Sequence, residues 1–355
     1  MWMKENNTVG KVRRHFLEEV ILSKINSDNP EIRTGPKHGV DTGAINISKE
    51  KLMVFSTDPL SIIPSIGLED SGWLSAQILF NDFVTCSLPP EYVTLCFNLP
   101  PKITDDEFKT YWESLIKEFD RLDVSVISGH TGRYVGCDYS IVGSGTIMGV
   151  CDINHYINSS MARTGDSVII TKGIAIESTS VIAKAFPKTI AKQFGKNFLE
   201  KIQKTFHQCS AVKDALIASS VGVGSEGVTA MHDITEGGVF GALSELASAS
   251  VKGLLIEKKS IPISDEAEKT CSFFGINPYT TLSSGSMLIT VTPEKEIEVI
   301  KALKSNDIPS TIIGKVTAPK KGCYILENES KKPLTTPDYD SYWNAFWKAT
   351  QKRWS

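Results

Sequence analysis

The chain has 355 residues, which is enough for two domains with separate hydrophobic cores, and its net charge is only −3. It contains no block of basic residues, which argues against nucleic acid as a partner. No apolar stretch approaches the roughly 18–20 residues that cross a bilayer, and the first residues lack the apolar segment of a secretory signal. The seven cysteines are widely spaced without a C-x-x-C pair, which indicates reduced thiols, a cytoplasmic protein and no structural zinc.

The beginning of the chain predicts one helix, a long loop and two short strands. Apolar residues at helical spacing predict a helix from Val9 to Ile25. The residues expected on its buried side are Val9, Val12, Phe16, Val20 and Ile21. Residues 26–41 are rich in Pro, Gly, Asn and charge, which predicts a long mobile loop. Strands follow over Ala44–Ile47 and Leu52–Ser56, so Asp58 is expected where the second strand gives way to a loop.

The next helical pattern, Glu69–Thr85, carries an acid in an unusual place. Asp82 follows Ile78 by four residues and Leu74 by eight, so it continues a largely apolar stripe. It also lies near the helix C-terminus, where the helix dipole disfavours an anion. Either Asp82 has a compensating cation in the fold, or the helix frays at Asn81 and the carboxylate is solvated.

A second amphipathic helix and two strands complete the first half. The stretch TDDEFKTYWESLIKEF opens with a capping box made by Thr104 and Glu107 and continues as a helix with an aromatic stripe, which is typical of core. A strand over Asp123–Ile127 runs into the motif SGHTGRYVG (128–136). A further strand over Tyr139–Val150 contains the glycines of GSGTIMG, but no helix follows it, so a dinucleotide-binding loop is not indicated.

The second half begins after a linker at residues 152–166 and has the same mixed character. The predicted strands are 167–171, 253–256, 287–291 and 310–316, and the predicted helices include 239–247, 263–274 and 294–305. This order predicts an α+β fold rather than a repeating βαβ ladder. We therefore expect two domains, residues 1–155 and 156–330, followed by a tail (331–355) that packs through its tryptophans.

The stretch AMHDITEGGVFGALSEL (230–246) places a histidine and two acids just before a helix. The start of a helix offers free N–H groups and a positive dipole end, which suit a phosphate or a carboxylate of the protein itself. On this stretch alone, the simpler interpretation is a helix capped by Asp233 or Thr235 with a tight turn at Gly237 and Gly238. The alternative is a phosphate or metal–phosphate site.

Four acids lie at predicted element ends or beside glycines: Asp41, Asp58, Asp82 and Asp233. Carboxylates gathered in one place repel one another unless a cation is present, and Mg²⁺ with nucleotide phosphates is a common solution. The order of motifs around them resembles the aminoimidazole-ribonucleotide synthetase (AIR synthase) superfamily over residues 9–317. The matching stretches are GVDTGAI (39–45), STDPL (56–60), DSGWLSAQILFNDF (70–83), SGHTGRYVG (128–136), RTGDSVIITKG (163–173), HDITEGGVFGALSELA (232–247), SFFGINPYTTLSSGSMLITV (272–291) and IIGKV (312–316).

The resemblance implies a fold and a set of site residues. It implies a homodimer whose N-terminal halves form a shared β-barrel with flanking helices, a sandwich-like α/β C-terminal half, and ATP with Mg²⁺ in a cleft. The implied metal ligands are Asp41, Asp58, Asp82 and Asp233. The implied nucleotide-binding residues are Lys37, Gly39, Thr57, Gly129, Thr131, Gly237 and Gly238, with the 26–41 loop closing over the γ-phosphate. His130 and Asp82 are the implied catalytic residues, and His38 and His232 lie beside ligands.

The implied reaction is phosphoryl transfer from ATP to an oxygen of an unidentified small-molecule acceptor. The chain most resembles the carbamoyl dehydratases of hydrogenase maturation, which act on their own C-terminal cysteine. The last cysteine here is Cys323, so that self-modification is not expected. Thiamine-monophosphate kinases carry two adjacent acids where this chain has Val40-Asp41, and the purine enzyme has an acid where His130 stands. The rival hypothesis is a non-catalytic nucleotide-binding relative that acts as a partner-binding subunit.

Overall fold

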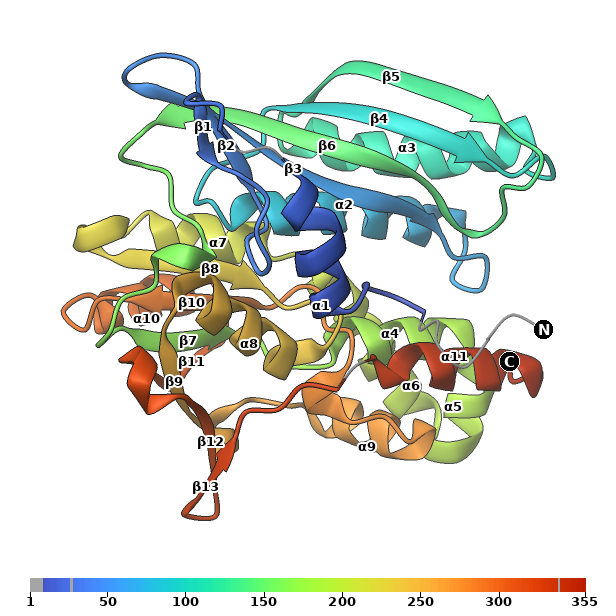
Figure 1. The fold of residues 1–355 in the computed structure, drawn as a ribbon. Coiled ribbons are helices and arrows are strands. Elements are labelled where there is room, and N and C mark those ends of the chain that lie inside the picture. Colours follow the sequence, from blue (N-terminus) through green and yellow to red (C-terminus); the bar gives the residue numbers. More distant parts are fainter. Residues whose placement is uncertain (1–8, 26–27, 338) are drawn as a thin grey trace.

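The computed structural model describes residues 9–25, 28–337 and 339–355. Its strands form two mixed sheets, one from residues 32–152 and one from residues 167–333, with helices packed around them (Figure 1). The α+β class expected from the sequence is confirmed.

The first sheet has the strand order β1-β2-β3-β6-β4-β5. Its strands are β1 (Ile32–Thr34), β2 (Gly43–Asn46), β3 (Lys51–Ile62), β4 (Tyr92–Leu99), β5 (Ser125–Arg133) and β6 (Ser140–Asp152). Strands β4 and β5 are parallel and joined by a helix, whereas the other neighbours are antiparallel. Helices α2 (Leu68–Val84) and α3 (Asp105–Arg121) cover one face, which we call the covered face. On the other face, here called the open face, none of the helices in the described part of the chain packs (Figure 1).

Strand β3 is longer than predicted, which changes the position of Asp58. The expected strand ended at Ser56, but β3 pairs with β6 as far as Ile62, so Asp58 lies within the strand and not at its end. Strand β2 accompanies β3 only to Phe55. Beyond that point one edge of β3 has no neighbouring strand, which accommodates Pro59, a residue without an N–H for the ladder.

The predicted N-terminal helix is shorter and less buried than expected. The chain is helical from Arg14 to Lys24, as α1 (Arg14–Phe16) followed by a π-helical and a 3₁₀ turn. The five side chains expected to be buried are instead between 40% and 53% exposed, because the described residues do not cover the apolar side of this segment. The long loop predicted over residues 26–41 is interrupted by β1, which pairs with β2; its residues 26–27 lie outside the described residues.

The two amphipathic helices of the first half are confirmed. Helix α3 has the predicted capping box, in which the Glu107 N–H donates to Thr104 Oγ1 at 3.2 Å and the Thr104 N–H donates to the Glu107 carboxylate at 2.8 Å. Its aromatic stripe packs in or against the core. Helix α2 does not fray at Asn81 but continues to Val84, because the Asn81 amide is buried and bonded to the backbone of Cys209 and Ala211.

The second sheet has the strand order β13-β12-β9-β11-β7-β10-β8. Its strands are β7 (Ser167–Thr171), β8 (Val228–Asp233), β9 (Gly253–Glu257), β10 (Met287–Val291), β11 (Ser310–Thr317), β12 (Cys323–Glu327) and β13 (Ser330–Pro333). The helices are α4 (Ile176–Ala185), α5 (Pro187–Phe194), α6 (Lys196–Lys204), α7 (Val212–Ser219), α8 (Gly238–Ser250), α9 (Asp265–Phe274), α10 (Glu296–Lys304) and α11 (Ser341–Gln351). The four predicted strands agree with β7, β9, β10 and β11, whereas β8, β12 and β13 were not predicted.

Helix α2 joins the two halves and thereby positions the candidate site. It packs on β3 and β6 of the first sheet and also contacts α7 and β8 of the second half. Leu79 and Phe83 of α2 belong to the same buried cluster as Ala215 of α7 and Met231 of β8. The C-terminal end of α2, which carries Asp82, therefore lies near the C-terminal end of β8.

The seven cysteines are all free, and four of them are buried, as expected for reduced thiols used as small apolar residues. Among the residues that the structure describes, no helix combines the length and apolar character that crossing a bilayer requires.

Candidate functional site

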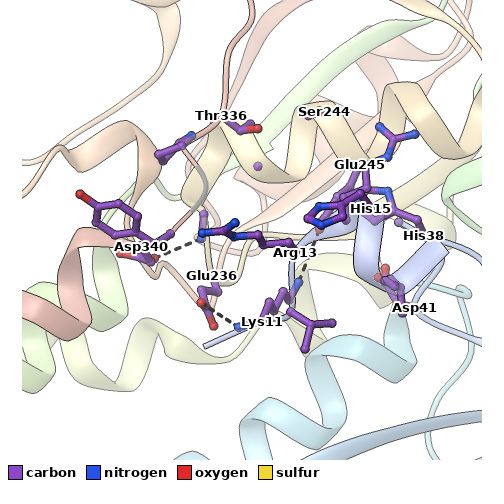
Figure 2. Close-up of a pocket in the computed structure, with 18 of the residues that line it drawn as sticks. Lys11, Arg13, His15, His38, Asp41, Glu236, Ser244, Glu245, Thr336 and Asp340 are labelled. Atoms are coloured by element: carbon purple, nitrogen blue, oxygen red, sulfur yellow. Dashed lines mark hydrogen bonds and ion pairs between the residues drawn. The ribbon is translucent and has the colours of Figure 1, made fainter. Parts of the chain in front are cut away.

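A cavity of about 530 Å³ lies between the two halves (Figure 2). Five parts of the chain line it: residues of the N-terminal segment between Lys11 and Leu17, residues 37–41, Asp82 of α2, residues between Glu236 and Glu245 at and before the first half of α8, and Thr336, Pro337, Tyr339 and Asp340. Asp41 and Asp82 lie in its wall. The cavity thus combines predicted site residues with both ends of the chain.

Two of the predicted acids meet because α2 packs on the covered face of the first sheet. Asp58 alternates with Thr57 along β3 and points to the same face as the buried Leu60, whereas Thr57 points to the open face. Asp58 and Asp82 lie close enough to share a proton. Burial, together with the neighbouring carboxylates, raises the pKa of Asp82 well above its usual range, and burial also raises the pKa of Asp58.

The other two acids meet through a buried histidine. His232 Nδ1 lies 3.1 Å from Asp41 Oδ2 and 3.7 Å from Asp233 Oδ1, and its Nε2 lies 3.1 Å from Glu245 Oε2. Burial opposes a charge on this imidazole, but Asp41, Asp233 and Glu245 raise its pKa well above the ordinary value. His232 therefore hydrogen-bonds Glu245 through Nε2 and forms ion pairs with Asp41 and Asp233 on its Nδ1 side.

The four acids fit a divalent cation. The pKa of Asp82 responds to the charges of Asp58, Asp233 and Asp41, which places all four within electrostatic reach. One oxygen each of Asp41, Asp58 and Asp233 is buried without a hydrogen-bond partner. Ligand atoms of Asp41, His232 and Asp233 all lie within 4.8 Å of one another. Buried carboxylate oxygens with unused acceptor capacity are the donor set that Mg²⁺ binds.

Within the described residues no side chain caps the start of α8, so the capping by Asp233 or Thr235 side chains that the sequence suggested is wrong. The Gly238 N–H donates to the Thr235 carbonyl at 3.1 Å, and the Gly237 N–H donates to Asp340 Oδ2 at 3.1 Å. The C-terminal tail therefore contacts the turn that precedes α8. Gly238 has a φ of +62°, and a Cβ there would lie 2.7 Å from the Thr281 nitrogen, so the turn requires glycine.

Two predicted nucleotide-binding residues precede β2 and line the cavity, with different orientations. Gly39 has a φ of +76°, and a Cβ there would lie 2.6 Å from the Glu245 carbonyl oxygen, so this glycine lets the loop pack directly on α8. The Lys37 ammonium donates to the Ala249 carbonyl at 2.6 Å, at the C-terminal end of α8. Because the acids lie near the other end of this helix, the structure does not bring the Lys37 charge to them.

The remaining predicted residues lie away from the acids within one chain. Thr57 bonds Thr146 Oγ1 at 2.9 Å on the open face. Gly129, His130 and Thr131 lie on strand β5 and not in a loop, and His130 bonds the Tyr134 hydroxyl at 2.6 Å. They are separated from Asp58 by strands β6 and β4, which corresponds to roughly 14 Å.

Six charged residues that line the cavity were missed by the sequence analysis: Lys11, Arg13, Arg14, Glu236, Glu245 and Asp340. Glu245 could have been identified from the sequence, because it follows Gly238 by seven residues and Gly241 by four and therefore lies on the same face of α8. Burial opposes its charge, yet Lys11 and His232 lower the pKa of Glu245 to about 2. Lys11 and Asp340 had no signal, because they reach the site from the two ends of the chain.

Comparison with known proteins identifies both halves of the chain. The N-terminal domain of AIR synthase related protein matches residues 39–151, and the corresponding C-terminal domain matches residues 163–326. A putative hydrogenase expression/formation protein of Methanocaldococcus jannaschii is 24% identical over 319 residues, 89% of this chain and 91% of the relative. A carbamoyl dehydratase HypE of Rhizobium leguminosarum is 26% identical over 299 residues, 82% and 79% of the two chains.

Solved structures share the fold at low sequence identity. The hydrogenase maturation protein HypE in complex with ATP superposes with a TM-score of 0.65 at 18% identity, covering 92% of this chain and 93% of the other. A ThiL complexed with AMPPCP and TMP superposes with a TM-score of 0.65, also at 18% identity, covering 84% and 90% of the two chains.

Proposed function

Because the chain belongs to the AIR synthase related protein family, we propose that it is an ATP- and Mg²⁺-dependent phosphoryl-transfer enzyme. The observation that carries this proposal is the convergence of four aspartates from both halves of the chain, in which Asp58 and Asp233 each have a buried oxygen without a partner and Asp41 is paired with His232. The relatives named carbamoyl dehydratase and thiamine-monophosphate kinase are enzymes, and members of this fold have been solved with ATP and with AMPPCP.

In this proposal Asp41, Asp58, Asp82 and Asp233 hold Mg²⁺, which when bound neutralises the phosphates of the nucleotide. The chain's own residues arrange this site: His232 orients Asp41, and α8 points its positive dipole end at the cavity. The acceptor presents an amide, carbonyl or phosphate oxygen to the γ-phosphoryl group. No serine or cysteine nucleophile is required, because the chemistry is positioning and charge neutralisation.

We also propose a homodimer in which the open faces of two first sheets form a shared barrel. Strand β5 is an unpaired edge of nine residues, on which Val126 is 43% and Ile127 55% exposed. Long apolar edges of this kind are usually covered. In such a dimer residues 1–155 would be the dimerising unit. His130 would act at a nucleotide site only if a second copy supplied it, because it lies away from the acids of its own chain.

The test is isothermal titration with a non-hydrolysable ATP analogue, with and without Mg²⁺, on the wild type and Asp233→Asn. We expect binding that requires Mg²⁺ and is lost in the variant, since one buried ligand oxygen is replaced by an amide. The fold is checked by circular dichroism. No binding to the wild type, or unchanged affinity in the variant, would contradict the proposal. Binding without turnover of ATP for any candidate acceptor would favour the partner-binding subunit.

A further inference from the structure

The N-terminal segment brings a lysine to the acids of the cavity. Lys11 lies outside both matched family domains, because the first of them begins only at residue 39. Its N–H donates to Glu236 Oε1 at 3.0 Å, and its ammonium donates to Thr235 Oγ1 at 3.2 Å and lies 3.7 Å from Glu245 Oε1 (Figure 2). Backbone and side chain are thus both fixed against the segment that connects β8 to α8.

The ammonium of Lys11 forms an ion pair with Glu245 and lines the same cavity as Asp41 and Asp82. Burial opposes its charge, but Glu245, Asp233, Asp82 and Asp41 together raise its pKa above the ordinary lysine value. His38 also lies near Glu245, at 3.9 Å, but burial lowers its pKa, so at neutral pH it contributes no second charge there. Lys11 therefore supplies a permanent positive charge beside the proposed metal ligands.

We propose that Lys11 is a phosphate-binding residue of the nucleotide site, and that in the nucleotide-free protein its ammonium neutralises the acids that later hold the metal. The proposal rests on the proposed function of the same site. An ammonium and Mg²⁺ beside the same carboxylates repel each other. Nucleotide phosphates relieve this repulsion, because they add negative charge that both cations bind.

This arrangement makes Lys11 act in opposite directions on two binding reactions. For the metal alone, Lys11 is a competitor, so its removal strengthens binding to the acids. For the metal–nucleotide complex, Lys11 is a ligand, so its removal weakens binding. A lysine that only held the N-terminal segment in place would weaken both or change neither.

The experiment titrates Lys11→Met, Lys11→Arg and wild type with Mn²⁺ alone, and then with a non-hydrolysable ATP analogue in saturating Mg²⁺. Lys11→Met is expected to bind Mn²⁺ about threefold more tightly and the analogue about tenfold more weakly. Lys11→Arg keeps the charge and is expected to restore most of the analogue affinity. Lys24→Met, at the far end of the N-terminal segment and outside the cavity lining, is the matched control.

Two failures can be told apart. A wild type that does not bind the analogue contradicts the proposed function and this assignment with it. A wild type that binds, with Lys11→Met indistinguishable from Lys24→Met, overturns the role of Lys11 alone. Weaker binding of both Mn²⁺ and the analogue in Lys11→Met also overturns it, because it indicates a structural contact. Thermal unfolding of each variant checks that the fold is kept.

Discussion

Neighbouring residues of one sequence motif lie on opposite faces of the first sheet. On the covered face, Asp58 meets Asp82 of α2 and, through it, the acids of the second half. On the open face, Thr57 bonds Thr146 and points away from these acids. Neighbours within the stretch STDPL therefore separate, because side chains alternate along a strand. A motif that matches a family as a unit does not place all its residues in one site.

The open face also explains why the SGHTGRYVG motif stands apart. Its residues 128–133 lie in the edge strand β5, where His130 is exposed and bonded to Tyr134. The acid site of one chain is built without it. In the proposed dimer, the open face and β5 are the surfaces that the second copy contacts.

The difference between the covered face and the open face is tested most directly by replacing Asp58 and Thr57 separately. Asp58→Asn removes a charge from the acid cluster, and we expect it to weaken Mg²⁺-dependent binding of an ATP analogue about 100-fold, or about 2.7 kcal/mol. Thr57→Val keeps the size of the side chain on the open face and is expected to change the affinity less than about twofold. Isothermal titration of both proteins measures the difference. Equal losses would show that both faces contribute to one site.

A second substitution, at the edge of the first sheet, tests the proposed dimer. Ile127→Lys places a charge on the exposed edge of β5 and is expected to weaken the proposed dimer at least about tenfold, because the cation has to be desolvated in the interface. Val135→Lys, at a side chain 98% exposed just beyond β5, is the control and is expected to leave the dimer intact. Sedimentation velocity over a dilution series measures both. A wild type that is monomeric throughout would contradict the dimer.

Local patterns predicted much of the fold. Strands β7 and β10, the capping box of α3 and the apolar face of α8 follow from spacing within one element, and the structure has them where expected. The exposed N-terminal segment was mispredicted because spacing shows that a helix has an apolar side but not whether the chain supplies a partner for it. The bond from the Gly237 N–H to Asp340 joins residues about one hundred positions apart, which no local pattern encodes.

The convergence of the acids was predictable only in part, for the same reason. Each of the four aspartates stood out locally, and the resemblance to a family united them. Lys11 and Glu245, which balance their charge, were missed because they matter only once β8, α8 and the N-terminal segment are assembled. The sequence thus identified the proposed metal ligands but not the charged residues that lie beside them.

The smallest expected effect concerns the pH dependence of stability without metal. The raised pKa values of Asp41, Asp58, Asp82 and His232 mean that the folded protein binds protons more tightly than the unfolded chain. Their contribution to stability is complete below the unfolded pKa values and is lost as the pH rises through the folded ones. The lowered pKa of Glu245 acts only in acid, where its contribution is lost as the pH falls towards about 2.

The melting temperature of the metal-free protein is therefore expected to fall by a few degrees between about pH 5 and pH 8, and Mg²⁺ is expected to restore more at the higher pH because it replaces the protons. Asp82→Asn removes the most strongly perturbed of the carboxyl groups, so its metal-free melting temperature should vary less with pH and respond less to Mg²⁺. Differential scanning calorimetry in chelator and in Mg²⁺ measures both. If the melting temperature of the variant depends on pH as strongly as that of the wild type, the Asp82 carboxyl group is not the source of this dependence.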